Sequence, residues 1–173
     1  MRNALTAIML ALGGSAAWSQ PPPAAPALPP PDCSGPEYRQ FDFWIGRWEV
    51  TQGGKLAGHN RISRELGDCA LREHWQGAGG LEGVSLNFFD RGDGRWHQLW
   101  VDGRGGVLRL SGSAPGPGQM LLESDPAASG PRQRIHWSLR EDGVVVQHWQ
   151  QSADGGASWT TAFLGEYRKQ VDE

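Results

Sequence analysis

Turn signals recur along this chain at nearly regular intervals, and they limit the length of every segment between them. Nine clusters rich in Gly, Asp and Pro divide the sequence, at residues 53–54, 67–68, 77–80, 92–94, 103–106, 115–118, 125–131, 142–143 and 154–157. Asp-Gly and Gly-Gly pairs are typical of hairpin turns, because such turns need positive φ angles. The intervening segments are rich in Trp, Val, Leu, Phe and Thr and are mostly too short for helices, so they are predicted to be strands.

The predicted fold class is all-β, with about ten strands in an antiparallel meander. The strands are expected near 48–52, 55–66, 69–76, 81–90, 95–102, 107–113, 119–124, 132–140, 144–152 and 158–168. With an even number of strands, the first and the last run antiparallel and can pair, which closes the sheet into a barrel without exposed edges. Ten short strands also suit a barrel wide enough to hold a small ligand. A sandwich of two open sheets is the alternative architecture.

The N-terminal residues have the composition of targeting and linker segments. Residues 1–19 are predicted to be a secretory signal peptide, with an early positive charge, a short apolar run and small residues near its end. Seven prolines within 21–31 then predict a Pro-rich linker over 20–36. The barrel domain is therefore expected over 37–170. A retained membrane anchor and a Pro-rich recognition motif are the alternatives for the first two segments.

The charge pattern limits the classes of partner. The chain carries a net charge of −3, and the loss of Arg2 with the signal peptide would make it −4. Charges of both signs are scattered without a basic stripe, which predicts no binding to nucleic acid. No segment approaches the ~20 apolar residues that a membrane-spanning helix needs, so no membrane insertion is expected. The predicted location is exported, either periplasmic or extracellular, and the oligomeric state is left open.

Two cysteines, Cys33 and Cys69, are present. In an oxidising compartment a lone pair favours a disulfide, which here would join the entry segment to the barrel wall. Two free thiols are the alternative. A metal site needs more ligands than these two residues supply.

The segment before the first expected strand, residues 36–45, is strongly aromatic and is predicted to be a short helical plug buried at one barrel end. Gly46-Arg47-Trp48 resembles the Gly-x-Trp motif of lipocalin-like barrels, in which the tryptophan closes the barrel base. Over 37–168 the chain also resembles an uncharacterised family of secreted bacterial proteins of the nitrobindin-like barrel group, on the basis of segments 60–62, 72–75, 85–87, 96–102 and 154–156. The resemblance implies a meander barrel of the calycin (lipocalin-like) type, and it implies no established chemistry.

Residues 152–159, Ser-Ala-Asp-Gly-Gly-Ala-Ser-Trp, resemble the Asp-box of sialidases, with Ser158 where threonine is usual. In those proteins the aspartate side chain bonds the amides of a turn and takes no part in catalysis. A single copy between two strands therefore predicts a hairpin turn.

Four of the five histidines stand directly beside a tryptophan, in the pairs His74-Trp75, Trp96-His97, His136-Trp137 and His148-Trp149. Neighbours in a strand point to opposite faces, so one face of the sheet collects tryptophan and the other collects histidine. Burial of indole rings is favourable, whereas a buried histidine needs a partner, so the tryptophan face, with Leu139, is predicted to point inward. Segment 95–102 is ambiguous, because Leu99 and Val101 share the histidine side.

The inward face then gathers one carboxyl group and two amides among tryptophans from three separate strands. The expected ligand-binding residues are Glu73, Trp75, Gln98, Trp100, Gln147 and Trp149. Polar groups inside a barrel must be paired with each other, with water or with a ligand, and aromatic rings with a few polar groups are typical of small-molecule sites. The predicted function is the binding of a small apolar or aromatic molecule inside an exported barrel. The alternative is a filled barrel whose outer surface serves a structural or interaction role.

No catalytic residue is predicted. The sequence lacks the Gly-x-Ser-x-Gly, His-Glu-x-x-His, Gly-x-x-x-x-Gly-Lys and Cys-x-x-Cys motifs. A buried Glu73 is a candidate general acid, but no second carboxylate is assigned to oppose it. No cofactor and no metal are predicted. Haem is the less favoured alternative, because nitrobindin-like barrels can hold haem through a histidine, and none of the histidines here matches that ligand by motif.

Overall fold

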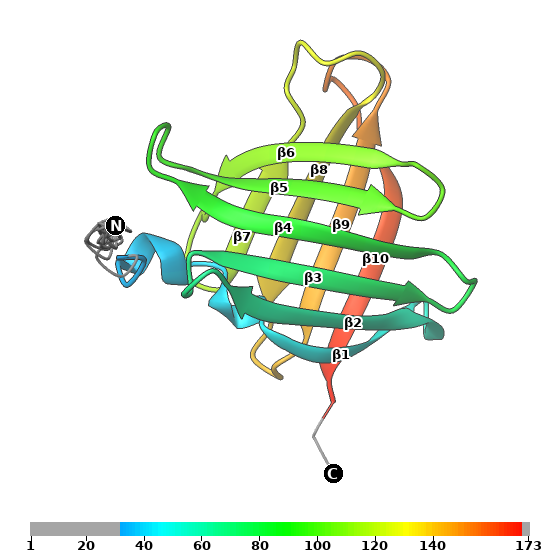
Figure 1. Cartoon of the computed structure of the whole chain (residues 1–173). Helices are drawn as coiled ribbons and strands as arrows, with labels where there is room; N and C mark the ends of the chain where they lie inside the picture. Colours follow the sequence, from blue (N-terminus) through cyan, green and yellow to red (C-terminus); the bar gives the residue numbers. More distant parts are fainter. Residues whose placement is uncertain (1–31, 171–173) are drawn as a thin grey trace, which may run out of the picture.

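The computed structural model describes residues 32–170 of the chain (Figure 1). Two short 3-10 helices, η1 (Pro36–Arg39) and η2 (Asp42–Trp44), precede the strands. The strands are β1 (Gly46–Gln52), β2 (Lys55–Glu65), β3 (Ala70–Gly77), β4 (Glu82–Asp90), β5 (Arg95–Asp102), β6 (Val107–Ser113), β7 (Gln119–Glu123), β8 (Arg132–Leu139), β9 (Val145–Ser152) and β10 (Thr160–Lys169). The predicted signal peptide and most of the predicted linker lie outside the described residues.

The ten strands form one closed antiparallel barrel in which each strand pairs with the next along the chain. The ring is completed between β1 and β10, where Trp48 lies opposite Lys169 and Val50 opposite Tyr167; Figure 1 shows these two strands side by side. The prediction of a closed ten-stranded meander is therefore confirmed, and the open sandwich is wrong. Between residues 32 and 170 the structure contains no helix with the length and hydropathy of a membrane span.

The observed strands begin and end within two residues of their expected positions. β10 begins at Thr160 because Ser158 is held in the preceding turn. The carboxylate of Asp154 accepts hydrogen bonds from the Ser158 backbone N–H at 2.8 Å and from its hydroxyl at 2.6 Å. The Ser152 hydroxyl accepts another from the Gly156 N–H at 2.8 Å. The Asp-box sequence is thus a hairpin turn, as predicted.

The tryptophan face points into the barrel. Trp96 and Trp137 are 2% and 0% exposed, whereas the neighbouring His97 and His136 are only partly buried on the outer face. The ambiguous strand β5 follows the same rule, because Leu99 and Val101 are exposed. Leu139 shares this face, because it pairs with the buried Val145, but as the last residue of β8 it lies at the rim of the barrel and is 44% exposed.

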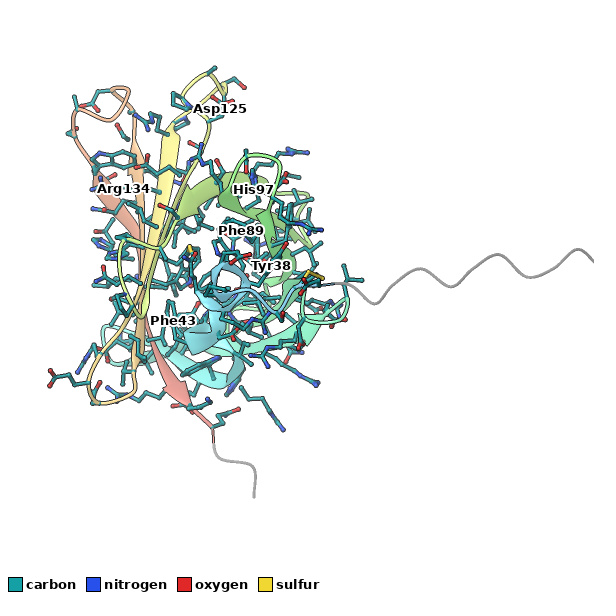
Figure 2. All side chains as sticks on the ribbon, turned by 90° about the vertical axis from the view of Figure 1, so that its left-hand side faces the viewer. Tyr38, Phe43, Phe89, His97, Asp125 and Arg134 are labelled. Atoms are coloured by element: carbon teal, nitrogen blue, oxygen red, sulfur yellow. A yellow bond between two sulfur atoms is a disulfide. The ribbon has the colours of Figure 1, made fainter. Side chains whose placement is uncertain are left out.

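Aromatic side chains from η2 and from the residue before it join the barrel core. Phe41 and Trp44 are fully buried and stack at 4.9 Å between ring centroids. Phe41 also contacts Trp96 at 5.7 Å and Trp137 at 5.2 Å, both edge to face. We call the barrel end where η1 and η2 lie the helical end; it faces the viewer in Figure 2, where Tyr38 and Phe43 lie over it.

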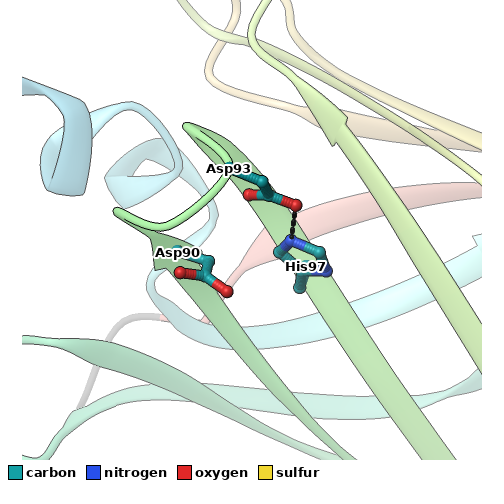
Figure 3. Close-up of side chains that lie close together, drawn as sticks. All are labelled: Asp90, Asp93 and His97. Atoms are coloured by element: carbon teal, nitrogen blue, oxygen red, sulfur yellow. Dashed lines mark hydrogen bonds and ion pairs between the residues drawn. The ribbon is translucent and has the colours of Figure 1, made fainter.

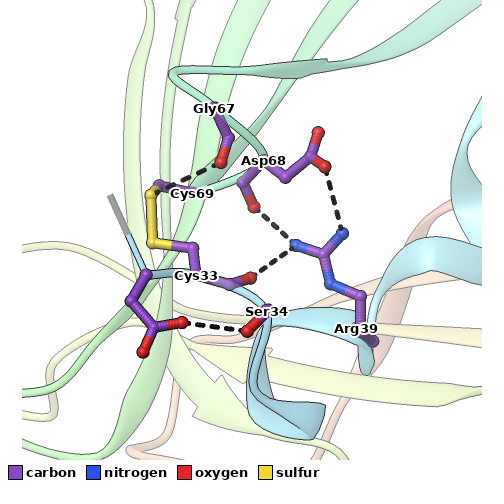
Figure 4. Close-up of a disulfide and its surroundings, with 7 residues drawn as sticks. Cys33, Ser34, Arg39, Gly67, Asp68 and Cys69 are labelled. Carbon is purple, nitrogen blue, oxygen red and sulfur yellow. Dashed lines mark hydrogen bonds and ion pairs between the residues drawn. A yellow bond between two sulfur atoms is a disulfide. The ribbon is translucent and has the colours of Figure 1, made fainter. Parts of the chain in front are cut away.

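A disulfide between Cys33 and Cys69 joins the entry segment to the turn before β3, as predicted (Figure 4). Arg39 reinforces this junction from η1, since its guanidinium donates to the backbone carbonyls of Cys33 at 3.2 Å and Asp68 at 2.5 Å. Asp42 binds both Arg39 at 3.7 Å and Arg64 at 2.6 Å. The first described residues are thus fixed to β2 and to the turn before β3 by a disulfide, a hydrogen bond from Arg39 to Asp68 and an ion pair between Asp42 and Arg64.

Replacement of Cys33 and Cys69 by serine should lower the free energy of unfolding by about 3–4 kcal/mol, the chain-entropy value for a loop of this size. The bond closes a loop with a sequence separation of 36 residues. Urea denaturation of the double variant and of the parent measures the difference, and thiol counting of the denatured, unreduced parent should find no free thiol. Equal midpoints for the two proteins would contradict this expectation.

Trp48→Ala should cost about 3–5 kcal/mol of stability, as for other large aromatic side chains in protein cores. Trp48 is 1% exposed, and its indole N–H donates to the Trp44 carbonyl at 2.9 Å. The matched control is Trp159→Ala, which removes a partly buried ring from the outer surface under Arg134. If both variants kept the denaturation midpoint of the parent, Trp48 would not be a core residue.

Candidate functional site

Strand direction explains why the expected site residues gather. In a closed meander all odd-numbered strands run the same way, so the C-terminal halves of β3, β5 and β9 point to one end of the barrel. Each of these strands presents the same inward series: a core residue, then a carboxyl or amide group, then a tryptophan. The series are Leu71-Glu73-Trp75, Trp96-Gln98-Trp100 and Val145-Gln147-Trp149. We call the end that carries the three tryptophans the mouth; it is opposite the helical end.

A cavity of about 290 Å³ opens at the mouth. All six residues expected from the sequence line it: Glu73, Trp75, Gln98, Trp100, Gln147 and Trp149. Its wall is completed by apolar Leu81, Leu108, Ile135 and Ala162, and by Asp102, Phe163 and Tyr167. The six residues thus come together in space. Their role in ligand binding stays a prediction.

Glycines on neighbouring strands keep this cavity open. A β-carbon placed on Gly83 of β4 would lie 2.2 Å from Cζ2 of Trp100, so the indole ring lies directly over that glycine. Phe163 lies over Gly165 in the same way, with Cε1 at 2.5 Å, and Trp75 over Gly58, with Cζ2 at 2.8 Å. The rings therefore rest against the barrel wall and leave the space at its centre unfilled.

A buried chain of hydrogen bonds runs across four strands and ends on Glu73. The amide of Gln98 donates to Asn87 Oδ1 at 2.9 Å, Asn87 donates to the Ser85 hydroxyl at 2.9 Å, and that hydroxyl donates to Glu73 Oε2 at 2.6 Å. From the other side, Asn60 Nδ2 donates to Glu73 Oε1 at 2.7 Å. Each donor points towards the carboxyl group, which is how a protein interior accommodates a buried acid.

Burial dominates the ionisation of the groups at the centre of this network. Glu73 is 5% exposed, and desolvation raises its pKa despite the hydrogen bonds from Ser85 and Asn60, which lower it. Burial also raises the pKa of Tyr167 well above its ordinary value, and the nearby charge of Glu73 adds to this effect. The Tyr167 hydroxyl thus stays protonated and donates a hydrogen bond to Gln147 Oε1.

Two amide atoms on the cavity wall have no hydrogen-bond partner among residues 32–170. Gln98 uses its Nε2 on Asn87, which leaves Oε1 as a free acceptor. Gln147 accepts from Tyr167 through Oε1, which leaves Nε2 as a free donor. The cavity therefore presents one acceptor and one donor, on opposite parts of the barrel, to a molecule inside it.

Sequence reasoning missed the residues that support Glu73. Ser85 and Asn87 alternate with Leu86, and the apolar Leu86 is the one that faces solvent, so the hydropathy pattern of β4 indicates the wrong face. Tyr167 and Phe163 on β10 also line the cavity, and the sequence pattern does not predict this. The register would have found Ser85, because it lies directly between Glu73 on β3 and Trp100 on β5.

The histidines in the described part of the chain do not line the cavity. His74 pairs with Glu82 at 2.6 Å, and His148 with the Thr161 hydroxyl at 2.9 Å, both on the outer surface. His136 and His148 are cross-strand neighbours there. The pKa of His136 is lowered, mainly by burial and secondly by the adjacent His148. The haem alternative requires a histidine that points into the barrel. Among the described residues, the cavity wall contains none.

A cluster that the sequence did not predict lies outside the barrel, at the turn between β4 and β5 (Figure 3). Asp90, Asp93 and His97 bring their ligand-type atoms within 4.8 Å of one another, and His97 Nε2 lies 2.9 Å from Asp93 Oδ2. The two carboxylates also accept backbone N–H groups of their own turn, from Gly92 and Arg95. These contacts give the cluster a structural role in the hairpin.

The fold and the cavity together define a closed ten-stranded antiparallel barrel with an aromatic pocket at one end. No protein-family model matches this sequence. A comparison with curated proteins also finds no match. The binding properties of the pocket therefore follow from the residues that line it.

Glu73→Gln should stabilise the protein more at about pH 8 than at about pH 4. A raised pKa means that the folded protein holds the Glu73 proton more tightly than the unfolded chain, whose reference pKa is 4.5. Folding stability is therefore lost as the pH rises from that value through the folded pKa, whereas glutamine keeps the neutral shape and cannot ionise. Urea denaturation at both pH values measures this effect.

Glu49→Gln, at an exposed position of β1, is the matched control for the loss of one carboxylate. A stability difference for Glu73→Gln that shrinks as the pH rises would mean that the environment of Glu73 favours its ionised form.

Proposed function

We propose that this protein binds a small apolar or aromatic molecule inside the mouth of its barrel. The observation that carries this proposal is the cavity of about 290 Å³, in which aromatic rings surround a free acceptor on Gln98 and a free donor on Gln147. Apolar walls with a few well-placed polar groups are the usual composition of a ligand site. The rings supply contact area, and the amides fix the orientation of the molecule.

The cavity favours ligand binding over the filled-barrel alternative. Trp75, Trp100 and Trp149 are only partly buried although they point inward, so their inner surface remains available to another molecule. The volume is close to the lower limit of about 300 Å³ for ligand pockets, which limits the ligand to one or two rings. A filled barrel would instead bury these indoles against apolar side chains.

We interpret the barrel as lipocalin-like and related to the nitrobindin-like group, and the segment at 36–45 as its helical plug. The buried contacts of Phe41 and Trp44 with inward-facing residues support the plug. The burial of Trp48 after Gly46 on β1 is in keeping with a Gly-x-Trp base. In this arrangement one end is closed by the plug, and the mouth is the entrance for the ligand.

We further propose that the protein is exported and works in the periplasm or outside the cell. The Cys33–Cys69 disulfide supports this location, because such bonds persist in oxidising compartments. The predicted signal peptide at 1–19 and the Pro-rich linker at 20–36 would then deliver the barrel and separate it from the cleavage site.

A screen of small aromatic compounds by intrinsic tryptophan fluorescence tests the binding function. Ligands in the cavity should change the emission of Trp75, Trp100 and Trp149. Gln98→Ala should weaken their affinity by about 1–3 kcal/mol if the amide bonds the ligand. Gly83→Val should abolish binding, because its side chain would displace the Trp100 ring into the cavity.

The matched control for Gly83→Val is Gly79→Val in the turn between β3 and β4, where an added β-carbon would meet nothing within 4 Å. This variant should keep the affinity of the parent. Ligands that bind Gly83→Val as tightly as the parent would bind elsewhere, and the cavity would then have no part in function.

A further inference from the structure

The cavity wall carries acidic groups and no cationic side chain. Its lining contains two carboxyl groups, Glu73 and Asp102, and no Lys, Arg or His. Low-dielectric walls strengthen the field of such groups, and an anionic ligand would be buried there without a cation to pair with. The lining therefore disfavours carboxylates and phosphates as ligands.

Trp100 and Phe163 are turned so that a ring face borders the cavity. Cζ2, Cη2 and Cε2 of Trp100 lie 2.2, 2.4 and 3.0 Å from the β-carbon position of Gly83, so the six-membered ring lies flat over that glycine. Phe163 covers Gly165 in the same manner, with two ring atoms at 2.5 and 2.7 Å. A ring with one face against the wall directs its other face inward, and the faces of aromatic rings attract cations.

Asp102 places a fixed negative charge beside these rings. It is the last residue of β5, two positions after Trp100 on the same inward face, which is about 6.8 Å along a strand. Its Oδ1 accepts the backbone N–H groups of Arg104 and Gly106, both at 2.9 Å. These bonds, with Gly106 the larger cause, lower the pKa of Asp102. Arg104 is exposed in the turn and does not line the cavity.

From the sign of the lining charges, the inward ring faces and the position of Asp102, we infer that the ligand is an organic cation. Its ammonium or quaternary ammonium group would lie against the Trp100 ring face near Asp102, with its apolar part against Leu108 and Ile135. This inference rests on the proposed binding function and adds the charge of the ligand to it.

Three probes that share one benzene ring and differ in charge test the inference: benzyltrimethylammonium, benzyl alcohol and phenylacetate. Binding to the full chain is measured by calorimetry at neutral pH, with tryptophan emission as a second readout. Benzyltrimethylammonium should bind about tenfold more tightly than benzyl alcohol, and phenylacetate more weakly than either.

Asp102→Asn removes the charge but keeps an Oδ1 acceptor for the turn, so the barrel should stay folded. It should reduce the preference for the cation over the alcohol severalfold. The matched control is Asp93→Asn in the turn between β4 and β5, where Oδ1 likewise accepts a backbone N–H. It should change neither affinity. Gly83→Val should abolish binding of the cation if the cation occupies the cavity.

The outcomes separate the two proposals. If benzyl alcohol binds as tightly as the cation, or if Asp102→Asn leaves the preference intact, the inferred ligand charge is wrong and the binding function stands. If no probe of any charge binds at millimolar concentration, the cavity does not accept small aromatic molecules, and both proposals fail.

Discussion

The pairing of β1 with β10 is the interaction on which the rest of the structure depends. It joins residues far apart in the chain, such as Trp48 and Lys169. The pairing therefore closes the longest loop in the fold and has the largest loop-closure entropy cost. In return it removes both sheet edges and separates an inside from an outside. Neighbouring side chains on a strand then lie in different surroundings: most indoles, the amides and the acids Glu73 and Asp102 face inward, and the histidines face solvent. Without this seam there would be neither a core nor a cavity.

Much of the fold could be predicted because its signals are local. Gly-rich and Asp-rich turns mark the ends of the strands, and the even number of strands predicts closure. The inward positions of Trp75, Trp100 and Trp149 follow from one further rule: neighbouring residues in a strand point to opposite faces of the sheet. Tryptophan prefers the interior more strongly than histidine does. This preference predicts the correct face of β5, although Leu99 and Val101 lie on the opposite face. The six expected site residues share one cavity for these reasons.

The remaining features depend on register and volume, which no single segment reveals. The stretch from Ser85 to Asn87 has the hydropathy of a strand whose apolar residue faces inward, yet Glu73 on the next strand needs the polar ones. Gly83 looks like an ordinary turn-side glycine until Trp100 is found lying over it. Asp90, Asp93 and His97 meet only because a hairpin folds them together. These are relations between strands, and sequence spacing carries no trace of them.

The common direction of β3, β5 and β9 has a consequence for how such a barrel can change over time. Every odd strand leaves the packed helical end and arrives at the mouth, so the residues that stabilise the fold and those that line the cavity occupy separate stretches of the same strands. Mutations at Trp75, Trp100 or Trp149 alter half-buried positions whose loss leaves Phe41, Trp44 and Trp137 in place. A lineage of these barrels can therefore reshape its cavity through a few codons at the mouth while the folding core is inherited unchanged.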